Sequence, residues 1–255
     1  MTARLSPLAF DVCCAEIGAA DRPYPLDVPH HGATLEERAR LRDAVFRDLQ
    51  ARRLARSGRL EPDFEGSLRT LAGPRRAIEA IILPDLTAAR GVCALAASNG
   101  RTAVLAVLDG SGVLLEEVPD SRLVAIVANL TRPPSGGRPV TYRLPLSGLQ
   151  PGCRRRTDTI LDRPTDEEAR HGADARTVRE ILARPRIAVG QFSATGIDRL
   201  GRRQRSATLD WFATVDGPFA SRTRIGPDGE QWITLSSAGH AMLTQRLGEL
   251  LGELP

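Results

Sequence analysis

The 255-residue sequence contains no lysine. All 35 of its basic residues are arginine, 31 acidic residues are spread through the same segments, and asparagine occurs only as Asn99 and Asn129. Abundant arginine, alanine, glycine and proline without lysine indicate the codon bias of a GC-rich genome. The net charge of +4 is compatible with an anionic partner, but the arginine content alone does not indicate a nucleic-acid interface.

Long apolar runs are also missing, since nowhere do about 18 consecutive apolar residues, enough to cross a bilayer, occur. The amino-terminal segment MTARLSPLAFDVCCAEIG is interrupted by Asp11 and Glu16, so it lacks the apolar core of a signal peptide. Cysteine is scarce and shows no disulfide-framework spacing; the four cysteines are Cys13, Cys14, Cys93 and Cys153. These absences predict a protein of the reducing cytoplasm.

Common catalytic and cofactor motifs do not occur: there is no Gly-x-Ser-x-Gly, His-Glu-x-x-His, Cys-x-x-Cys or Gly-x-Gly-x-x-Gly motif. Gly196 and Gly201 have the spacing of a phosphate-binding loop, but two arginines follow where Lys-Ser/Thr is required. The His30-His31 pair lies in a proline- and glycine-rich segment that is poorly suited to hold a metal ion. The sequence therefore predicts no catalytic residue, no cofactor and no metal site.

Several helices are marked by their start signals. Ser6-Pro7 supplies a capping hydroxyl and a first-turn proline, and apolar residues follow at helical spacing. Thr34 and Glu37 form a capping box, Pro62 begins a shorter helix, and Asp120 is expected to cap another. A second capping box, Thr165 with Glu168, predicts a helix that runs to about residue 184.

Short apolar or alternating runs separated by turn residues predict antiparallel strands in two groups of four. A helix follows each group, so the same order occurs twice, over residues 75–130 and 186–253. This duplication predicts an α+β fold, a single domain over residues 1–255, with two pseudo-twofold-related halves and with additional amino-terminal and central helices. Residues 146–163 carry no pattern that assigns them.

The stretch GQFSATGIDRLGRRQR, residues 190–205, falls between two of these strands. We predict an exposed hairpin loop there, followed by one continuous strand in RRQRSATLDWFATV. Alternation along that strand places Leu209 and Trp211 on a buried face. The opposite face is expected to be polar; it includes Gln204, Ser206, Thr208 and Asp210.

Five segments taken in order resemble the EspG family of type VII (ESX) secretion-associated proteins of actinobacteria. They are LSPLAFDVCCAEIGAADRPYPLDVP, GATLEERARLRDAVFRDLQARRL, AVLAVLDGSGVLLEEVP, GQFSATGIDRLGRRQR with LDWFATVDGPFASR, and WITLSSAGHAMLTQRLGELL. The resemblance implies a cytosolic, non-catalytic chaperone that binds PE/PPE-type helical heterodimers and keeps them soluble before export. It also implies an α+β fold with two pseudo-twofold-related halves, and it leaves open a monomer or a weak homodimer.

The resemblance further implies where a partner binds. In relatives the surface draws on the loop between the first two strands of the first sheet, on the central sheet and on the carboxy-terminal helices. Carried onto this chain, that surface includes the loop from Pro84 to Gly91 and the polar strand face. The predicted contact residues are Asp85, Leu86, Thr87, Gln204, Ser206, Thr208 and Asp210. Leu86 could instead belong to the core, and both possibilities remain open here.

Two other functions remain as alternatives. Arginine clusters at 52–59, 154–156 and 199–205 favour a nucleic-acid-binding protein, but aromatic residues make up only 4% of the chain. Single-strand binders usually combine positive charge with stacking rings. A hydrolase-like enzyme is the least favoured alternative, because no histidine lies in a recognisable catalytic arrangement.

Overall fold

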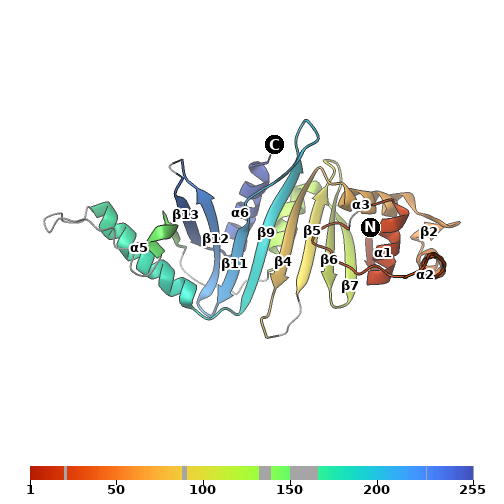
Figure 1. Cartoon of the computed structure of the whole chain (residues 1–255), viewed down its shortest axis with the longest axis horizontal. Coiled ribbons are helices and arrows are strands. Elements are labelled where there is room, and N and C mark those ends of the chain that lie inside the picture. The colour runs from red at the N-terminus through yellow and green to blue at the C-terminus, as the bar shows by residue number, and fades with distance from the viewer. Residues whose placement is uncertain (20–21, 88–90, 132–138, 150–165, 228, 255) are drawn as a thin grey trace.

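The computed structural model describes residues 1–19, 22–87, 91–131, 139–149, 166–227 and 229–254, and the side chains of 166–171 are left aside. These residues form one long antiparallel sheet with helices on both of its faces (Figure 1). Eleven strands belong to the sheet within this described part, and β2 (Ala55–Arg56) with β3 (Arg59–Leu60) makes a separate small hairpin. None of the described helices is long and apolar enough to cross a membrane.

The strand order explains how one sheet is built from two groups of four strands. Along the sheet the order is β1-β7-β6-β5-β4-β9-β11-β12-β13-β8, with β10 attached to β9. The first group is β4 (Arg76–Leu83), β5 (Val92–Ser98), β6 (Ala103–Asp109) and β7 (Gly112–Val118), and β1 (Thr2–Leu5) lies beside β7. The second group is β9 (Ala188–Ile197), β11 (Leu209–Thr214), β12 (Gly217–Ile225) and β13 (Gln231–Ser237), and β8 (Thr141–Pro145) lies beside β13.

From either outer edge, the sheet therefore has the same succession of strands. Each outermost strand precedes a helical segment in the chain, then four strands run from the centre outward, and a helix follows. The helix after the first group is α4 (Leu123–Ala128), and the helix after the second is α6 (His240–Gly252). The predicted α+β fold with pseudo-twofold-related halves is confirmed, with the difference that the two halves share one continuous sheet.

The halves meet where β4 pairs with β9. Eight antiparallel residue pairs join these strands, from Arg76 opposite Gly196 to Leu83 opposite Val189. Because directly opposed residues share a face, this register fixes which side chains point to each side of the sheet.

One face of the central sheet is covered by α4 and α6, which contact each other. In Figure 1, α6 lies behind the strands. Their apolar side chains pack on Ile78, Ile82, Phe192 and Trp211 in one continuous core. The helices of the two halves thus close the same face of the sheet.

The other face is covered only toward its two ends. At one end lie α1 (Pro7–Glu16), α2 (Leu35–Ala51) and α3 (Pro62–Ala72), whose core includes the β5–β7 side chains that point to this face. At the other end, α5 (Asp166–Ala183) packs on Phe212, Phe219 and Leu235. Between these two helical layers, parts of β4, β9 and β11 remain without a covering helix, and we call this region the open face.

The predicted helix starts at Ser6 and Thr34 are confirmed. The Ser6 hydroxyl accepts a hydrogen bond from the Ala9 backbone N–H at 3.1 Å, and the Thr34 hydroxyl accepts one from the Glu37 N–H at 3.1 Å. The second predicted capping box depends on Thr165, which lies outside the described residues. Each confirmed cap satisfies a backbone donor that the first helical turn would otherwise leave without a partner.

The expected cap at Asp120 is wrong. A short 3₁₀ turn, η1 (Asp120–Arg122), precedes α4, and no side chain caps either segment. The Asp120 carboxylate instead forms an ion pair with Arg76 and accepts a hydrogen bond from the Ser98 hydroxyl at 2.5 Å. A guanidinium and a hydroxyl bind this carboxylate more strongly than the backbone N–H groups of a helix N-terminus would. Strand β1 and the β2–β3 hairpin were not predicted either.

Helix α1 contains a buried charge. The side chain of Asp11 is fully buried and forms ion pairs with the guanidinium groups of Arg22 and Arg38. The backbone N–H of His31 also donates to its carboxylate, at 3.1 Å, and the His30 ring lies 3.6 Å from it. The histidine segment is therefore held against α1 by a carboxylate, and no group of three potential metal ligands occurs among the described residues.

Replacing Asp11 with Ala should destabilise the fold by about 3 kcal/mol, because it leaves two arginines that are largely buried without their anion. This loss of stability is at the low end of the range measured when one partner of a buried ion pair is removed, because both arginines keep some contact with water. The free energy of unfolding in urea measures the effect. Asp43→Ala, which removes an exposed carboxylate, is the matched control and should cost less than about 0.5 kcal/mol. Equal effects of the two substitutions would contradict this role for Asp11.

The two cysteines of α1, Cys13 and Cys14, are buried in the core. Burial raises the pKa of Cys13 and of Cys14 to about 12. At pH 8 only about one molecule in ten thousand then carries the reactive thiolate at either position. We expect iodoacetamide to leave both cysteines unmodified in the folded protein and to label both in urea, as read by peptide mass spectrometry. Labelling of the folded protein at the rate of a free thiol would show that α1 opens readily.

Candidate functional site

The loop after β4 lies at one end of the open face. The backbone N–H of Leu86 donates to the Ile187 carbonyl at 3.1 Å, which attaches the loop to the segment that leads into β9. The Asp85 carboxylate accepts hydrogen bonds from the Thr87 N–H at 2.8 Å and hydroxyl at 2.6 Å. Leu86 is 42% exposed. Of the two possibilities for this leucine, the structure favours the exposed one.

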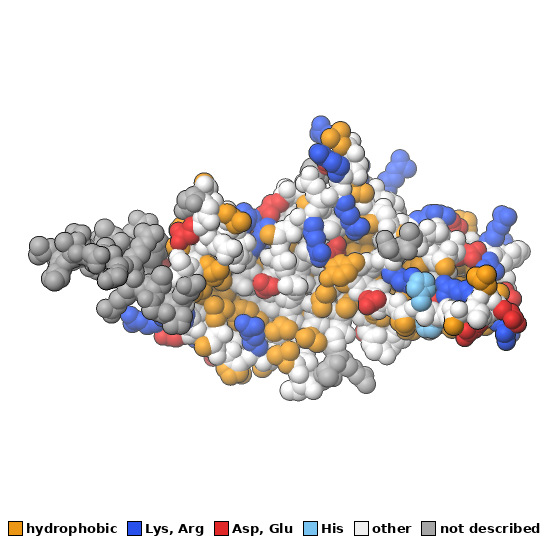
Figure 2. All heavy atoms as spheres, in the orientation of Figure 1, with side chains coloured by type: hydrophobic (Ala, Val, Ile, Leu, Met, Phe, Trp, Pro, Cys, Tyr) orange, Lys and Arg blue, Asp and Glu red, His pale blue; other side chains and the backbone are white. Residues whose placement is uncertain are grey.

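Other exposed apolar side chains lie at the same end of the strands. Ile187 is 44% exposed and donates its backbone N–H to the Ala213 carbonyl, so it lies between the β4–β5 loop and the end of β11. Val215, in the turn after β11, is 81% exposed. We call Leu86, Ile187, Val215 and the nearby Ile81 the apolar end. Figure 2 shows hydrophobic side chains gathered over the lower ends of the central strands.

A groove of about 340 Å³ adjoins the apolar end, between the open face and the last turns of α5. Its apolar lining comes from Ile81 and Leu83 of β4, Leu182 of α5 and Val189 of β9. Its polar lining consists of Arg186, Gln191, Asp210 and Ser221. The Gln191 side-chain amide donates to the Asp210 carboxylate at 3.1 Å, and the Arg186 guanidinium lies 4.9 Å from the centre of the Phe212 ring. The groove therefore has an apolar floor with a hydrogen-bonding rim.

The predicted continuous strand after the hairpin is interrupted by a β-bulge. Arg205 lies opposite Thr195 in the β10–β9 pairing, whereas Leu209 lies opposite Phe192 in the β11–β9 pairing. Three residues, 206–208, therefore face only two of β9. One extra residue shifts the alternation, so side chains before and after the bulge no longer follow a single period of two.

The bulge separates the residues expected on one polar face. Gln204 of β10 (Arg203–Arg205) lies opposite Gly196, on the α6 side, whereas Asp210 lies opposite Gln191 on the open face. Gly196 and Gln191 are five residues apart, about 16 Å along the strand. The prediction that Gln204, Ser206, Thr208 and Asp210 share one face is wrong. Asp210 lies toward the same end as Asp85, Leu86 and Thr87, and Gln204 lies toward the other.

Ser206 stabilises the bulge itself. Its hydroxyl accepts a hydrogen bond from the Ala194 N–H at 2.9 Å and donates to the Ala207 carbonyl at 3.0 Å. Its own backbone N–H donates to the Ala194 carbonyl at 2.8 Å. The hydroxyl thus replaces a ladder bond that the extra residue removes, while the neighbouring Thr208 is exposed.

An ion pair covers the part of the open face that lies toward the β9–β10 hairpin. Glu79 is almost fully buried; its carboxylate pairs with the Arg205 guanidinium at 2.6 Å and accepts a hydrogen bond from the Ser193 hydroxyl at 2.9 Å. The Arg205 guanidinium also lies 5.1 Å from the centre of the Tyr24 ring. This part of the face is therefore polar and carries a paired charge, in contrast to the apolar end.

The predicted exposed hairpin loop between β9 and β10 is confirmed. The Asp198 carboxylate accepts hydrogen bonds from the Leu200 and Arg202 backbone N–H groups and from the Arg202 side chain, and Gly201 adopts a φ of 78°. Arg202 and Arg205 are thus paired with carboxylates, as is Arg52 with Asp48. The arginine cluster at 154–156 lies outside the described residues. The two described clusters are only partly available to bind phosphates.

Comparison with known proteins supports the expected family. The EspG family model matches residues 6–249. The chain belongs to the EspG family. No curated protein sequence matches it significantly.

A solved structure supports the same fold for this EspG family member. It contains the Mycobacterium tuberculosis type VII secretion system chaperone EspG5 in complex with a PE25–PPE41 dimer. The similarity has a TM-score of 0.67 and covers 100% of this chain and 97% of that chain, at 13% sequence identity. At this identity the likeness establishes the fold alone.

Sequence reasoning missed most of the groove of this EspG protein. Ile81 lies in the run Ala-Ile-Ile-Leu, which predicts a strand buried on both sides. Ile187 and Val215 flank strands without any periodic pattern, so nothing in the sequence marks them as exposed neighbours of Leu86. Only the strand order, which places β4, β9 and β11 side by side, brings these residues together.

Ser206→Ala should destabilise the protein by about 1–2 kcal/mol, because the buried N–H of Ala194 loses its acceptor. Thr208→Ala in the same bulge is the matched control and should change stability by less than about 0.5 kcal/mol. Thermal and urea unfolding of the two variants provide the measurement. If both variants behave alike, the Ser206 hydroxyl does not stabilise the bulge.

Proposed function

We propose that this EspG protein is a non-catalytic chaperone of type VII secretion that binds PE/PPE-type helical heterodimers in the cytoplasm. The observation that carries the proposal is the apolar end beside a polar-rimmed groove on the open face of the sheet. In this role the surface covers an apolar patch of the secreted dimer and keeps it soluble until export. The solved complex of the EspG5 chaperone with a PE25–PPE41 dimer supports this choice of partner.

The apolar end has the chemistry that such a task requires. Leu86, Ile187 and Val215 expose branched aliphatic side chains that gain nothing from contact with water. Gln191, Asp210 and Arg186 provide hydrogen-bond donors and acceptors around them. An apolar centre with a polar rim is the usual arrangement of a protein–protein interface and requires no catalytic group.

Asp85, Leu86, Thr87 and Asp210 form the part of the proposed contact set that lies toward this end. Asp85 and Thr87 fix the loop conformation, so Leu86 is presented from a preformed turn. We place Gln204 at the margin of the surface, because the bulge turns it away from Asp210, and the exposed Thr208 within the bulge. Ser206 contributes by holding the bulge.

The repeated order of elements leads to a second part of the proposal. We infer that residues 75–130 and 186–253 are copies of one ancestral unit within a single domain over residues 1–255. The strand order, which is the same from both edges of the sheet, supports this relation. A monomer or a weak homodimer is compatible with the role, since the open face needs only one copy of the chain.

Leu86→Arg and Ile187→Arg should each lower the affinity for a PE/PPE-type heterodimer at least about tenfold. A fully buried aliphatic side chain contributes about 1.5–3 kcal/mol, and 1.4 kcal/mol corresponds to a factor of ten. Co-purification and calorimetric titration of the co-expressed heterodimer measure the loss. Because both side chains are exposed, the melting temperature should not change.

Leu200→Arg provides the matched control, since Leu200 is also an exposed leucine but lies in the hairpin loop at the other end of the strands. It should leave capture unchanged. Unchanged capture by both Leu86→Arg and Ile187→Arg would show that the partner binds elsewhere. A lower melting temperature for either variant would show that its side chain belongs to the core.

A further inference from the structure

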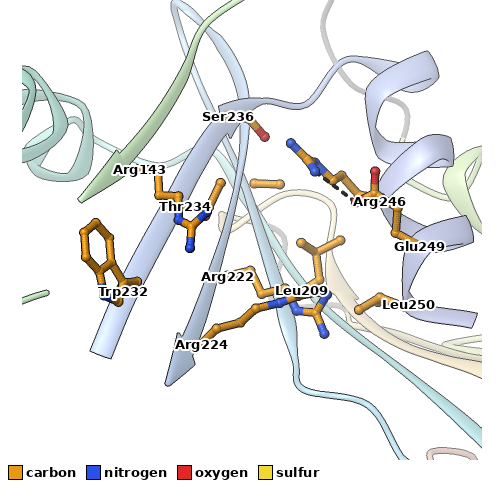
Figure 3. Close-up of a pocket in the computed structure, with 11 residues that line it drawn as sticks. Arg143, Leu209, Arg222, Arg224, Trp232, Thr234, Ser236, Arg246, Glu249 and Leu250 are labelled. Carbon is orange, nitrogen blue, oxygen red and sulfur yellow. Dashed lines mark hydrogen bonds and ion pairs between the residues drawn. The ribbon is translucent and has the colours of Figure 1, made fainter. Parts of the chain in front are cut away.

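A second hollow lies on the opposite side of the sheet, between α6 and the outer strands. Its volume is about 210 Å³, and its walls come from β8, β12, β13 and α6. Four arginines line it: Arg143, Arg222, Arg224 and Arg246 (Figure 3). We call this hollow the arginine pocket. It is separate from the open face, because the β12 and β13 side chains that line it point to the α6 side.

Positive charge exceeds negative charge in the arginine pocket. Arg246 is neutralised by Glu249, at 2.9 Å, and Arg222 and Arg224 both pair with the single carboxylate of Glu253. Within the part of the chain that the structure describes, no carboxylate lies in ion-pair distance of Arg143. Its guanidinium lies 5.4 Å from the centre of the Trp232 ring. Four guanidinium groups therefore share two carboxylates.

The existing pairs show which ligand group these arginines accept. Arg222 donates to one Glu253 carboxylate oxygen at 2.7 Å and to the other at 2.5 Å, a two-pronged arrangement that matches the planar guanidinium. The hydrogen bonds from Arg222, followed by the charges of Arg222 and Arg224, lower the pKa of Glu253. The buried Nε of Arg222 has no hydrogen-bond partner among the described residues. A carboxylate at this position is therefore held in its charged form.

We propose that the arginine pocket binds the carboxylate side chains of an acidic protein segment, with Glu253 as an internal competitor. Arg143 and Arg224 are exposed and can reach an incoming carboxylate without any change in the sheet. The site favours a protein segment because Arg222 already binds a side-chain carboxylate here through two parallel hydrogen bonds. Trp232 offers no free ring face for a base on the side where Arg143 lies.

The arginine pocket lies on the other side of the sheet from the open face, so its test and the test of the proposed chaperone surface can fail separately. A fluorescein-labelled hexaglutamate peptide, titrated against the full chain at about 50 mM salt, tests it by anisotropy; at that ionic strength exposed charges are only partly screened. Hexaglutamine of the same length is the neutral control peptide and should bind at least about tenfold more weakly, since its amide oxygens carry no charge and form no ion pair with the arginines.

Substitutions in the arginine pocket test whether hexaglutamate binds there. Arg143→Gln and Arg224→Gln should each weaken hexaglutamate binding about threefold to tenfold, whereas Arg199→Gln in the hairpin loop should have no effect. Glu253→Gln should strengthen binding about threefold or more, because it frees two arginines from their shared carboxylate. A gain of affinity on removing a native carboxylate is not expected if Glu253 only stabilises the end of α6.

Tryptophan fluorescence reports whether the peptide binds inside the arginine pocket. The chain has two tryptophans, of which Trp211 is buried in the core and Trp232 lines the pocket. Hexaglutamate should change the emission of the wild type but not that of Trp232→Phe. Equal binding of hexaglutamine, or unchanged binding by Arg143→Gln and Arg224→Gln, overturns the proposal. Tighter binding of single-stranded DNA with the same dependence on Arg143 would overturn it in favour of a nucleic-acid site.

Discussion

The pairing of β4 with β9 is the constraint on which the rest of the structure depends. It joins two strand groups into one sheet, and its register decides which residues point to each face. Ile78 and Phe192 face α4 and α6, whereas Glu79 and Gln191 face the opposite side. A shift of β4 by one residue against β9 would turn Glu79 into the helix-covered core and expose Ile78 and Ile82. The site on the open face exists only in this register.

The two faces of the sheet provide two different surfaces. The open face combines aliphatic side chains with a neutral, hydrogen-bonded rim, which suits an apolar partner. The arginine pocket, on the face that α6 covers, is lined by four arginines, of which three pair with carboxylates of the carboxy-terminal segment. Because sheet and helix separate them, ligands of opposite chemistry can be held by one chain without competing. Most of the arginines that the structure describes form ion pairs with carboxylates. In the arginine pocket the arginines outnumber the carboxylates, so positive charge remains there.

Local signals predicted much of the fold. The caps at Ser6 and Thr34, the helix after the second group of strands and the repeated order of strands all depend on residues close in sequence, and each is confirmed. Elements that depend on distant partners were missed: β1 forms because β7 offers it an edge, and Asp120 turns to Arg76 across the sheet. The bulge at 206–208 could not be predicted, because the sequence continues to alternate between polar and apolar residues through the extra residue. Leu86 was identified only through the family resemblance, and its apolar neighbours lie in β4, just before β9 and just after β11.

The junction of the halves also has a consequence for biosynthesis. More than a hundred residues separate each β4 residue from its β9 partner, so the ribosome completes the first half long before the second strand of the junction emerges. Until then β4 is an aliphatic-rich edge whose backbone N–H and C=O groups lack partners on one side, the kind of edge that pairs with other chains. Closing a loop of this length is also slow compared with forming local hairpins. A protein that shields the apolar surface of others thus passes through a stage in which its own central strand is unprotected.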